Sequence, residues 1–205
     1  KNKMTDLKDA GQSDTVQLDN VPWELAELDR WVVWRYEVKG NGKPAKVPYN
    51  AKTGNRASVS NPEDWCSFVD AVEASRDSHY SGLGIVFVAE DSVCGVDIDH
   101  CRNENGILTP EAVNIVRAIG SYAEVSPSGN GIKIFCRGRV DLETGRRCKI
   151  DDRQNLELYT SGRYFTFTGQ GLPNISTNLS DASDALENIV SKYLDTKQPQ
   201  PAKRA

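Results

Sequence analysis

Two aspartates, Asp97 and Asp99, are the side chains whose types and spacing first suggest chemistry in this 205-residue sequence. They alternate with Val96 and Ile98 in the run Val-Cys-Gly-Val-Asp-Ile-Asp-His (93–100). In a β-strand alternate residues share a face, so the two carboxylates would lie side by side, opposite a buried apolar face. Neighbouring carboxylates repel each other unless a cation lies between them, and hard oxygen ligands favour Mg²⁺ or Mn²⁺. The pattern predicts a metal site of the kind used in nucleotidyl transfer; an exposed strand edge is the alternative.

A loop of small residues, Ser-Pro-Ser-Gly-Asn-Gly (126–131), precedes the strand-like run Ile-Lys-Ile-Phe (132–135). Small residues and glycines let backbone N–H groups approach an anion, and serine hydroxyls and a lysine add further donors. Nucleotide binding is therefore predicted for Ser126, Ser128, Gly129 and Lys133. The loop lacks the GxxxxGK[ST] spacing and leads into a strand, which argues against a P-loop ATPase. A plain serine-glycine turn is the alternative.

A third segment, Leu-Glu-Leu-Tyr-Thr-Ser-Gly-Arg-Tyr-Phe-Thr-Phe-Thr-Gly (156–169), holds an acid between leucines. Glu157 would be costly to bury as an anion without a cation beside it, so it is predicted to be a third metal ligand. Arg163 follows the Ser161-Gly162 turn and is predicted to bind a phosphate through its planar guanidinium. An exposed hairpin arginine is the alternative for Arg163.

The order and character of these three segments resemble the signature motifs of the archaeo-eukaryotic primase superfamily: an acidic DxD strand, a phosphate-binding loop and a strand with a third acid. The upstream stretch from Trp31 to Trp65 is similar to the N-terminal part of phage and plasmid primase-polymerase domains, so the resemblance spans about residues 22–171. It implies an α+β fold, in which an RNA-recognition-motif-like catalytic sheet with packed helices joins an N-terminal α/β unit.

The resemblance also implies a function. A DNA primase and DNA polymerase would hold two Mg²⁺ or Mn²⁺ ions on Asp97, Asp99 and Glu157, and would join NTPs or dNTPs on a single-stranded DNA template. The relatives imply a replication protein of a phage, plasmid or mobile element, with a fused or associated helicase. One residue departs from the pattern. Lys133 stands where the second motif commonly carries a histidine, and a lysine supplies charge but does not shuttle protons near neutral pH.

Charge is distributed unevenly around these motifs, although the net charge is −4. Seven Lys or Arg and one acid lie between Arg30 and Arg56, and seven bases and four acids lie between Lys133 and Arg153. Eleven acids and two bases lie between Asn61 and Glu111. Basic segments around an acidic, metal-binding centre suit a nucleic-acid backbone, so Lys46 and Arg56 are predicted to contact DNA. A solvated surface is the alternative for each basic run.

Composition bounds the class of protein. A hydrophobic content of 38% suits a soluble globular domain. No apolar run approaches the roughly 20 residues of a membrane span, so we expect a cytoplasmic protein with no membrane contact. The five cysteines are an odd number without a CxxC pair, which indicates reduced thiols and neither a disulfide framework nor a zinc module.

Hydrophobic patterning predicts the elements that must position the motifs. Strands are expected at 31–38, 45–49, 122–125 and 131–136, and helices at 22–28, from Thr109-Pro110-Glu111 to near Gly120 and from about 181 to 194. A helix is expected to begin at Asn61-Pro62, with Trp65, Phe68, Val69 and Val72 on its buried face. Residues 83–89 and 93–98 are expected to form a buried hairpin, and 156–168 a long strand broken at Ser161-Gly162.

The expected domain organisation is one primase-polymerase domain at 21–195, with an N-terminal α/β part at 21–80 and a catalytic core at 81–195. Residues 1–20 and 196–205 are expected to be a flexible N-terminus and a flexible linker. Two other functions remain open at this stage. One is a non-catalytic primase-like module that binds nucleic acid, and the weaker one is a metal-dependent nuclease or nucleotide hydrolase.

Overall fold

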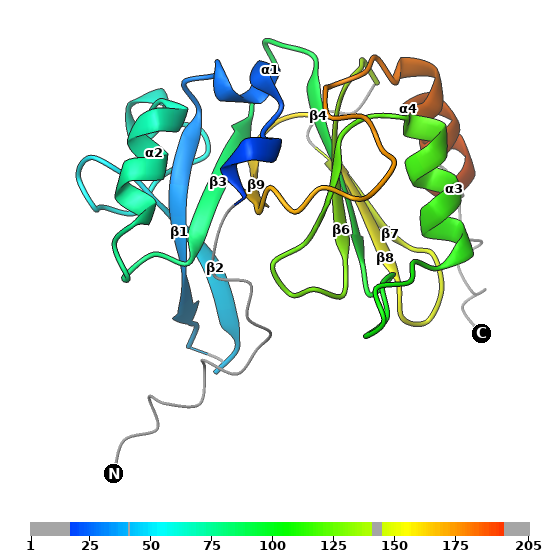
Figure 1. The fold of residues 1–205 in the computed structure, drawn as a ribbon, viewed down its shortest axis with the longest axis horizontal. Coiled ribbons are helices and arrows are strands. Elements are labelled where there is room, and N and C mark those ends of the chain that lie inside the picture. The colour runs from blue at the N-terminus through cyan, green and yellow to red at the C-terminus, as the bar shows by residue number, and fades with distance from the viewer. Residues whose placement is uncertain (1–16, 41, 141–144, 195–205) are drawn as a thin grey trace, which may run out of the picture.

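Two antiparallel sheets stand side by side in the computed structural model, which describes residues 17–40, 42–140 and 145–194 (Figure 1). Sheet A has the strand order β2-β1-β3-β9 and sheet B the order β5-β6-β4-β8-β7. The strands of sheet A are β2 (Pro44–Tyr49), β1 (Trp31–Val38), β3 (Gly82–Phe87) and β9 (Arg163–Phe167). Those of sheet B are β5 (Ala123–Val125), β6 (Ile132–Arg137), β4 (Val93–Asp99), β8 (Asn155–Tyr159) and β7 (Gly145–Lys149).

Helices cover the outer sides of both sheets (Figure 1). α3 (Pro110–Ile119), α4 (Ser183–Ile189) and the π-helical turn η3 (Val190–Leu194) pack on sheet B, where Val96 and Ile98 are fully buried. α2 (Phe68–Ser75) packs on sheet A through Phe68, whose ring lies 4.8 Å from that of Trp31. The short elements α1 (Trp23–Ala26), η1 (Leu18–Asn20) and η2 (Pro62–Asp64) complete the fold.

The two sheets meet at Gly95 on β4. A Cβ atom at this glycine would lie 2.5 Å from ring atoms of both Phe165 and Phe87, which belong to sheet A. Only a residue without a side chain allows this approach. Asp97 lies two residues further along β4 and therefore on the same face. The aromatic contact thus ends where the acidic residues begin.

Local patterns predicted many elements correctly. β1 spans 31–38 as expected, and α3 begins after the N-cap Thr109 and ends at Gly120 in the left-handed conformation. The mixture of helices with antiparallel sheets confirms an α+β fold. In the described residues no helix has both the length and the apolar character needed to cross a membrane.

The predicted hairpin of residues 83–89 and 93–98 is wrong. β3 pairs with β1 and β9, whereas β4 pairs with β6 and β8 in the other sheet. All six residues of β3 are buried, so its sequence carries no apolar-polar alternation that would favour one partner or face over another. The long strand expected at 156–168 likewise divides at the predicted break into β8 of sheet B and β9 of sheet A.

The helix expected at Asn61-Pro62 is also wrong. Asn61 caps only the 3₁₀ turn η2, and α2 begins separately after its own N-cap, Ser67, whose hydroxyl accepts from Asp70 N. Val69, expected on the buried face, is 74% exposed. The prediction placed Trp65, Phe68 and Val69 on one face of a continuous helix. Trp65 is extended, so α2 begins only at Phe68 and Val69 faces solvent.

The two sheets do not divide at residue 80, where the N-terminal part was expected to end. Sheet A contains β1 and β2 from before this residue and β3 and β9 from after it. The segments expected to be flexible are 1–20 and 196–205. Residues 1–16 of the first and all of the second lie outside the described residues. Residues 17–20 of the first segment are described: Gln17 N donates to Thr168 O, and Asn20 Nδ2 donates to Gly169 O.

Candidate active site

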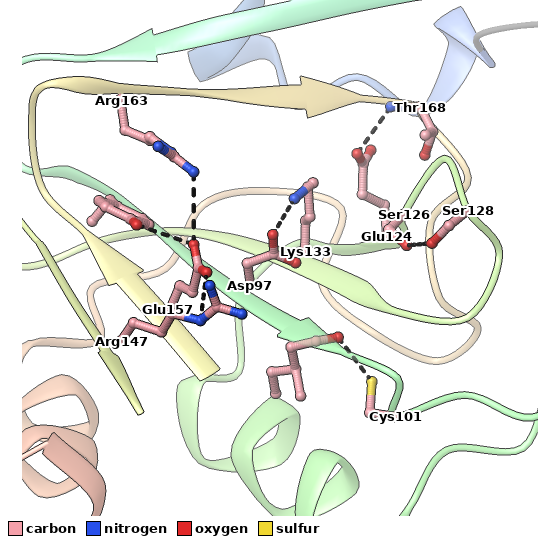
Figure 2. Close-up of polar contacts among 12 residues, drawn as sticks. Asp97, Cys101, Glu124, Ser126, Ser128, Lys133, Arg147, Glu157, Arg163 and Thr168 are labelled. Carbon is pink, nitrogen blue, oxygen red and sulfur yellow. Dashed lines mark hydrogen bonds and ion pairs between the residues drawn. The ribbon is translucent and has the colours of Figure 1, made fainter. Parts of the chain in front are cut away.

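One charged residue from each strand of sheet B forms a single line across the sheet. The strand register pairs Glu124 with Lys133, Lys133 with Asp97, Asp97 with Glu157, and Glu157 with Arg147. Directly paired residues share a face, so all five side chains lie on the side of the sheet that Gly95 presents to sheet A. We call these five residues the Asp97 row (Figure 2).

Lys133 and Asp97 form the central ion pair of the row. Lys133 Nζ lies 2.5 Å from Asp97 Oδ2, and the two side chains are only 7% and 15% exposed. The ammonium also lies 4.4 Å from the centre of the Phe165 ring, a cation–π contact from sheet A. Asp97 Oδ1 is buried and has no hydrogen-bond partner in the described part of the chain. One oxygen of this carboxylate is therefore left for a ligand.

Asp99 lies two residues beyond Asp97 on the same face and is half-buried. Its carboxylate makes no hydrogen bond or ion pair with the residues that the structure describes. Burial raises the pKa of Asp99, the negative charge of Asp97 raises it further, and Lys133 opposes the shift. The carboxylate pair therefore has the property expected from the sequence, a mutual repulsion that a cation would relieve.

Glu157 lies beside Asp97 but is already surrounded by donors. Its Oε1 lies 3.1 Å from Arg147 Nε, and its Oε2 lies 3.9 Å from Arg163 Nη2 and accepts from the Tyr159 hydroxyl at 3.0 Å. Figure 2 shows both arginines directed at this carboxylate. Both are more than half exposed, so they can reach other anions without disturbing the core.

The fit of this site to a divalent cation differs between its acids. Asp97 and Asp99 offer unpaired carboxylate oxygens on one face, which suits a hard cation. Among the described residues, no three His, Cys, Asp or Glu side chains form a group that could hold a metal ion. Glu157 would have to turn away from Arg147 and Arg163 to join the aspartates. The aspartate pair fits the predicted metal, and the third ligand stays a prediction.

The small-residue loop lies next to the end of β4. Ser126 N donates to Gly131 O, and Gly129 has a φ of +76°, a conformation that favours glycine. A Cβ at Gly131 would lie 2.8 Å from Ile98 O and 3.4 Å from Asp99 Cα, so this glycine is required for the close approach. The loop residues Ser126, Ser128 and Gly129 therefore stand beside the Asp99 end of the site.

Side chains hold this loop in place. Ser128 Oγ lies 3.0 Å from Ser126 Oγ and donates to Asn130 Oδ1 at 2.6 Å. Arg102 Nη1 donates to Gly129 O at 2.9 Å. His100, in the left-handed conformation with a φ of 56°, lies 3.3 Å from Asn130 Nδ2 through its Nδ1. These contacts fix the loop, in which Ser128 is exposed and Ser126 is buried.

Sheet A brings one of the two predicted DNA contacts to the site. Burial lowers the pKa of Lys46, the charge of Lys133 lowers it further, and Asp97 and Asp99 partly offset these effects. Lys46 therefore lies within electrostatic range of the Asp97 row. Arg56 does not share this position: it is exposed and forms an ion pair with Glu37.

Two members of the row were not predicted as site residues. Arg147 lies on the edge strand β7, whose Gly-Arg-Arg-Cys-Lys sequence carries no strand pattern, although the basic run at 133–153 includes it. Glu124 lies between Ala123 and Val125 and is fully buried, and this placement of an acid in an apolar strand was the available signal.

Glu124 links the two sheets. Its carboxylate accepts from the backbone N–H groups of Thr168 and Gly169, both at 2.9 Å, and from the Tyr122 hydroxyl at 3.0 Å. Thr168 and Gly169 directly follow β9 of sheet A. Burial raises the pKa of Glu124 to about 7, against the lowering effect of these hydrogen bonds.

An apolar groove between α3 and α4 lies on the other side of sheet B. It is lined by Ile115, Ala118, Ala185, Ile189 and Tyr193, with no residue of the Asp97 row. We therefore identify the candidate site from the charged side chains of the Asp97 row and not from this groove.

Comparisons with known proteins indicate the family of the chain. No family model matches the chain. Over 147 residues, 71% of its length, the chain is 34% identical to the protein named DNA Primase-polymerase from Nitratiruptor phage NrS-1. The match covers 20% of that relative, so the chain spans about a fifth of the relative's length.

Proposed function

Because the chain belongs to the phage-type primase-polymerase domains, we propose that it is the catalytic domain of a DNA primase and DNA polymerase. One observation carries the proposal: strand register places Lys133, Asp97 and Glu157 on one line, with Asp99 and the loop at 126–131 beside them. This arrangement gathers carboxylates for a cation and donors for a triphosphate on one face. We further propose that the two sheets represent the archaeo-eukaryotic primase fold.

Asp97, Asp99 and Glu157 are the proposed ligands of two Mg²⁺ or Mn²⁺ ions. The chemistry that such ions supply is activation of the attacking 3′-hydroxyl and stabilisation of the leaving pyrophosphate. Lys133, Ser126, Ser128, Gly129 and Arg163 are proposed to bind the incoming NTP or dNTP. Lys133 Nζ lies 2.5 Å from Asp97, and the ammonium has three N–H donors, so it can donate to a phosphate through one that Asp97 does not use.

A proton balance follows from these residues. The 3′-hydroxyl of a primer, or of a first nucleotide, attacks the α-phosphate, a P–O bond forms, and the bond to pyrophosphate breaks. The hydroxyl proton must leave to a base. The Lys133 ammonium, which is paired with Asp97, has no lone pair to accept it, so a carboxylate or a water molecule would take the proton.

The partners and setting of the reaction are also proposals. A single-stranded DNA template would approach from the basic side of sheet A, where Lys46 lies near the aspartates. We propose as the setting the replication of a phage, plasmid or mobile element in the cytoplasm, with a fused or associated helicase; the relative's name supports the primase-polymerase activity and a phage origin.

A second candidate function, a non-catalytic nucleic-acid-binding module, is favoured by a specific observation. Asp97 is already neutralised by Lys133, which stands in place of the motif histidine. Incubation with primed and unprimed single-stranded templates, dNTPs, rNTPs and Mn²⁺ separates the candidates. Extension or de novo synthesis supports the first, binding without products supports the second, and shortened strands would indicate a nuclease.

A further inference from the structure

The β1–β2 hairpin exposes an aromatic and apolar surface close to the candidate site. Tyr36 is 43% exposed and Val38 is 60% exposed, although both belong to a strand of sheet A. The Tyr36 ring packs edge-on against the buried Trp34 ring, with centroids 5.1 Å apart and an interplanar angle of 85°. One side of Tyr36 is thus fixed by the core while the other meets solvent.

Strand register determines which residues accompany Tyr36. Tyr36 pairs with Lys46 of β2, and Val38 pairs with Pro44. Paired residues share a face, so Tyr36, Val38 and Lys46 lie together, and we call these three residues the hairpin face. The Tyr36 and Lys46 side chains start from Cβ atoms about 5 Å apart.

On the opposite face of the same hairpin, neighbouring side chains bind the carboxylate of Glu37. Glu37 accepts from the Tyr49 hydroxyl and forms ion pairs with Arg35 at 3.3 Å and with Arg56. The Arg35 guanidinium also lies 4.2 Å from the centre of the Tyr49 ring. Glu37 is the sole acid of β1 and β2, so the hairpin face presents positive charge and apolar area without a carboxylate.

The backbone beneath Lys46 is held by sheet A. The Tyr164 hydroxyl of β9 donates to Lys46 O at 2.8 Å, and the Tyr164 ring lies over Gly84, where a Cβ would come within 2.7 Å of it. Lys46 Nζ lies 5.9 Å from the centre of the Trp34 ring. The Lys46 backbone is therefore fixed by Tyr164. Burial lowers the pKa of the Lys46 ammonium, and the charges of Asp97 and Asp99 act on it against this lowering.

We propose that the hairpin face binds an unpaired nucleic-acid strand, with one base stacked on Tyr36 and a neighbouring phosphate on Lys46. The exposed ring and the lysine beside it supply the two contacts that single strands need, an aromatic surface and a cation. A duplex has no unstacked base to offer, so the face distinguishes the two forms. The inference rests on the proposed function in one respect, that the bound strand is the template or the primer.

Equilibrium binding of a fluorescently labelled single-stranded oligonucleotide, without nucleotides, tests the proposal. Replacing Tyr36→Ala or Tyr36→Leu should weaken binding roughly 5- to 100-fold, the range for loss of one stacked base, whereas Tyr36→Phe should bind as the wild type does. Leucine retains apolar cover over Trp34 but has no π-face. It therefore decides the test should the alanine variant fail to fold.

A matched control is Trp23→Ala, because Trp23 is a 57% exposed aromatic residue of α1, and α1 lies at the end of sheet A away from the β1–β2 turn (Figure 1). It should leave the affinity unchanged. Wild-type affinity in Tyr36→Leu, or an equal loss in Trp23→Ala, overturns the proposal.

Primer extension by the same variants separates this inference from the proposed function. Weakened binding by Tyr36→Leu, in a protein whose wild type extends no primer, would uphold the hairpin face and reject the polymerase. Primer extension by the wild type, together with unchanged binding by Tyr36→Leu, would uphold the polymerase and reject the hairpin face.

Discussion

Two lysines approach Asp97 from different sheets, and the molecule holds them in different ways. Lys133 is buried within the Asp97 row and bound to the carboxylate at 2.5 Å. Lys46 comes from the edge strand β2 and contacts no acid directly in the described residues, although the aspartates influence its pKa. Removing one partner of a buried ion pair destabilises the fold, whereas a substitution at the surface of an edge strand usually changes the stability little. We therefore expect changes in the Asp97 row to affect synthesis and folding, and changes in the hairpin face to affect single-strand binding more than folding.

The largest expected effect is the loss of synthesis when the two aspartates are changed. Asp97→Asn together with Asp99→Asn should lower primer extension at least ~1000-fold, because the loss of the proposed metal-ligand charge would cost several kcal/mol in the transition state. Single-strand affinity should stay within about twofold of wild type, since the hairpin face is intact. Glu73→Gln, at an exposed acid of α2, is the control and should change neither. Synthesis that survives the double change would remove the Asp97 row from the mechanism.

The second effect is on folding and concerns the buried ion pair. Lys133→Met leaves the Asp97 carboxylate buried without its partner, which should cost about 4 kcal/mol of unfolding free energy. Adding Asp97→Asn to this variant should recover part of that loss, because the uncompensated charge is then removed. Urea denaturation of both single variants and the double variant measures the coupling. Additive losses would show that the pair carries no special interaction.

The third effect is a dependence of stability on pH at Glu124. Its folded pKa of about 7 lies above the ordinary value of 4.5, so the folded state holds the proton more tightly. The stabilisation is complete below about pH 4.5 and is lost as the pH rises through about 7, by ~3 kcal/mol in order of magnitude. Urea denaturation from pH 5 to 8 should show this slope in the wild type and a flatter profile in Glu124→Gln. Equal slopes would place the ionisation elsewhere.

The sequence predicted the acidic face but not the line that crosses the sheet. Alternation with Val96 and Ile98 was enough to place Asp97 and Asp99 together, because strand periodicity is local. The pairing of Asp97 with Lys133 and Glu157 depends on register between segments about 36 and 60 residues away, which no local pattern encodes. Glu124 was missed for a related reason, since its partners are backbone groups of Thr168 and Gly169 on a distant segment.

The division into two sheets was not predicted either. Short links after β3 and β8 have the length of hairpin turns, and length favours pairing of adjacent strands. Burial of Phe87 and Phe165 against Gly95 instead requires each link to cross between sheets, and this packing preference is visible only once both sheets are formed. The same crossing brings Phe165 over Lys133, so the site depends on the division of the predicted strand at 156–168 between the two sheets.

The smallest expected effect sharpens the comparison within sheet A, where the sequence grouped Lys46 and Arg56 as DNA contacts. The two side chains serve opposite faces of the β1–β2 hairpin, since Arg56 pairs with Glu37 and Lys46 lies beside Tyr36. Lys46→Ala should therefore reduce the salt dependence of single-strand binding by about 0.7 in the log–log slope, the value for one phosphate contact. Arg56→Ala should leave the slope unchanged, because its guanidinium is occupied by Glu37. Oligonucleotide titrations from 50 to 200 mM salt measure both slopes, and equal reductions would mean that the strand wraps around the edge of β2 and contacts both faces.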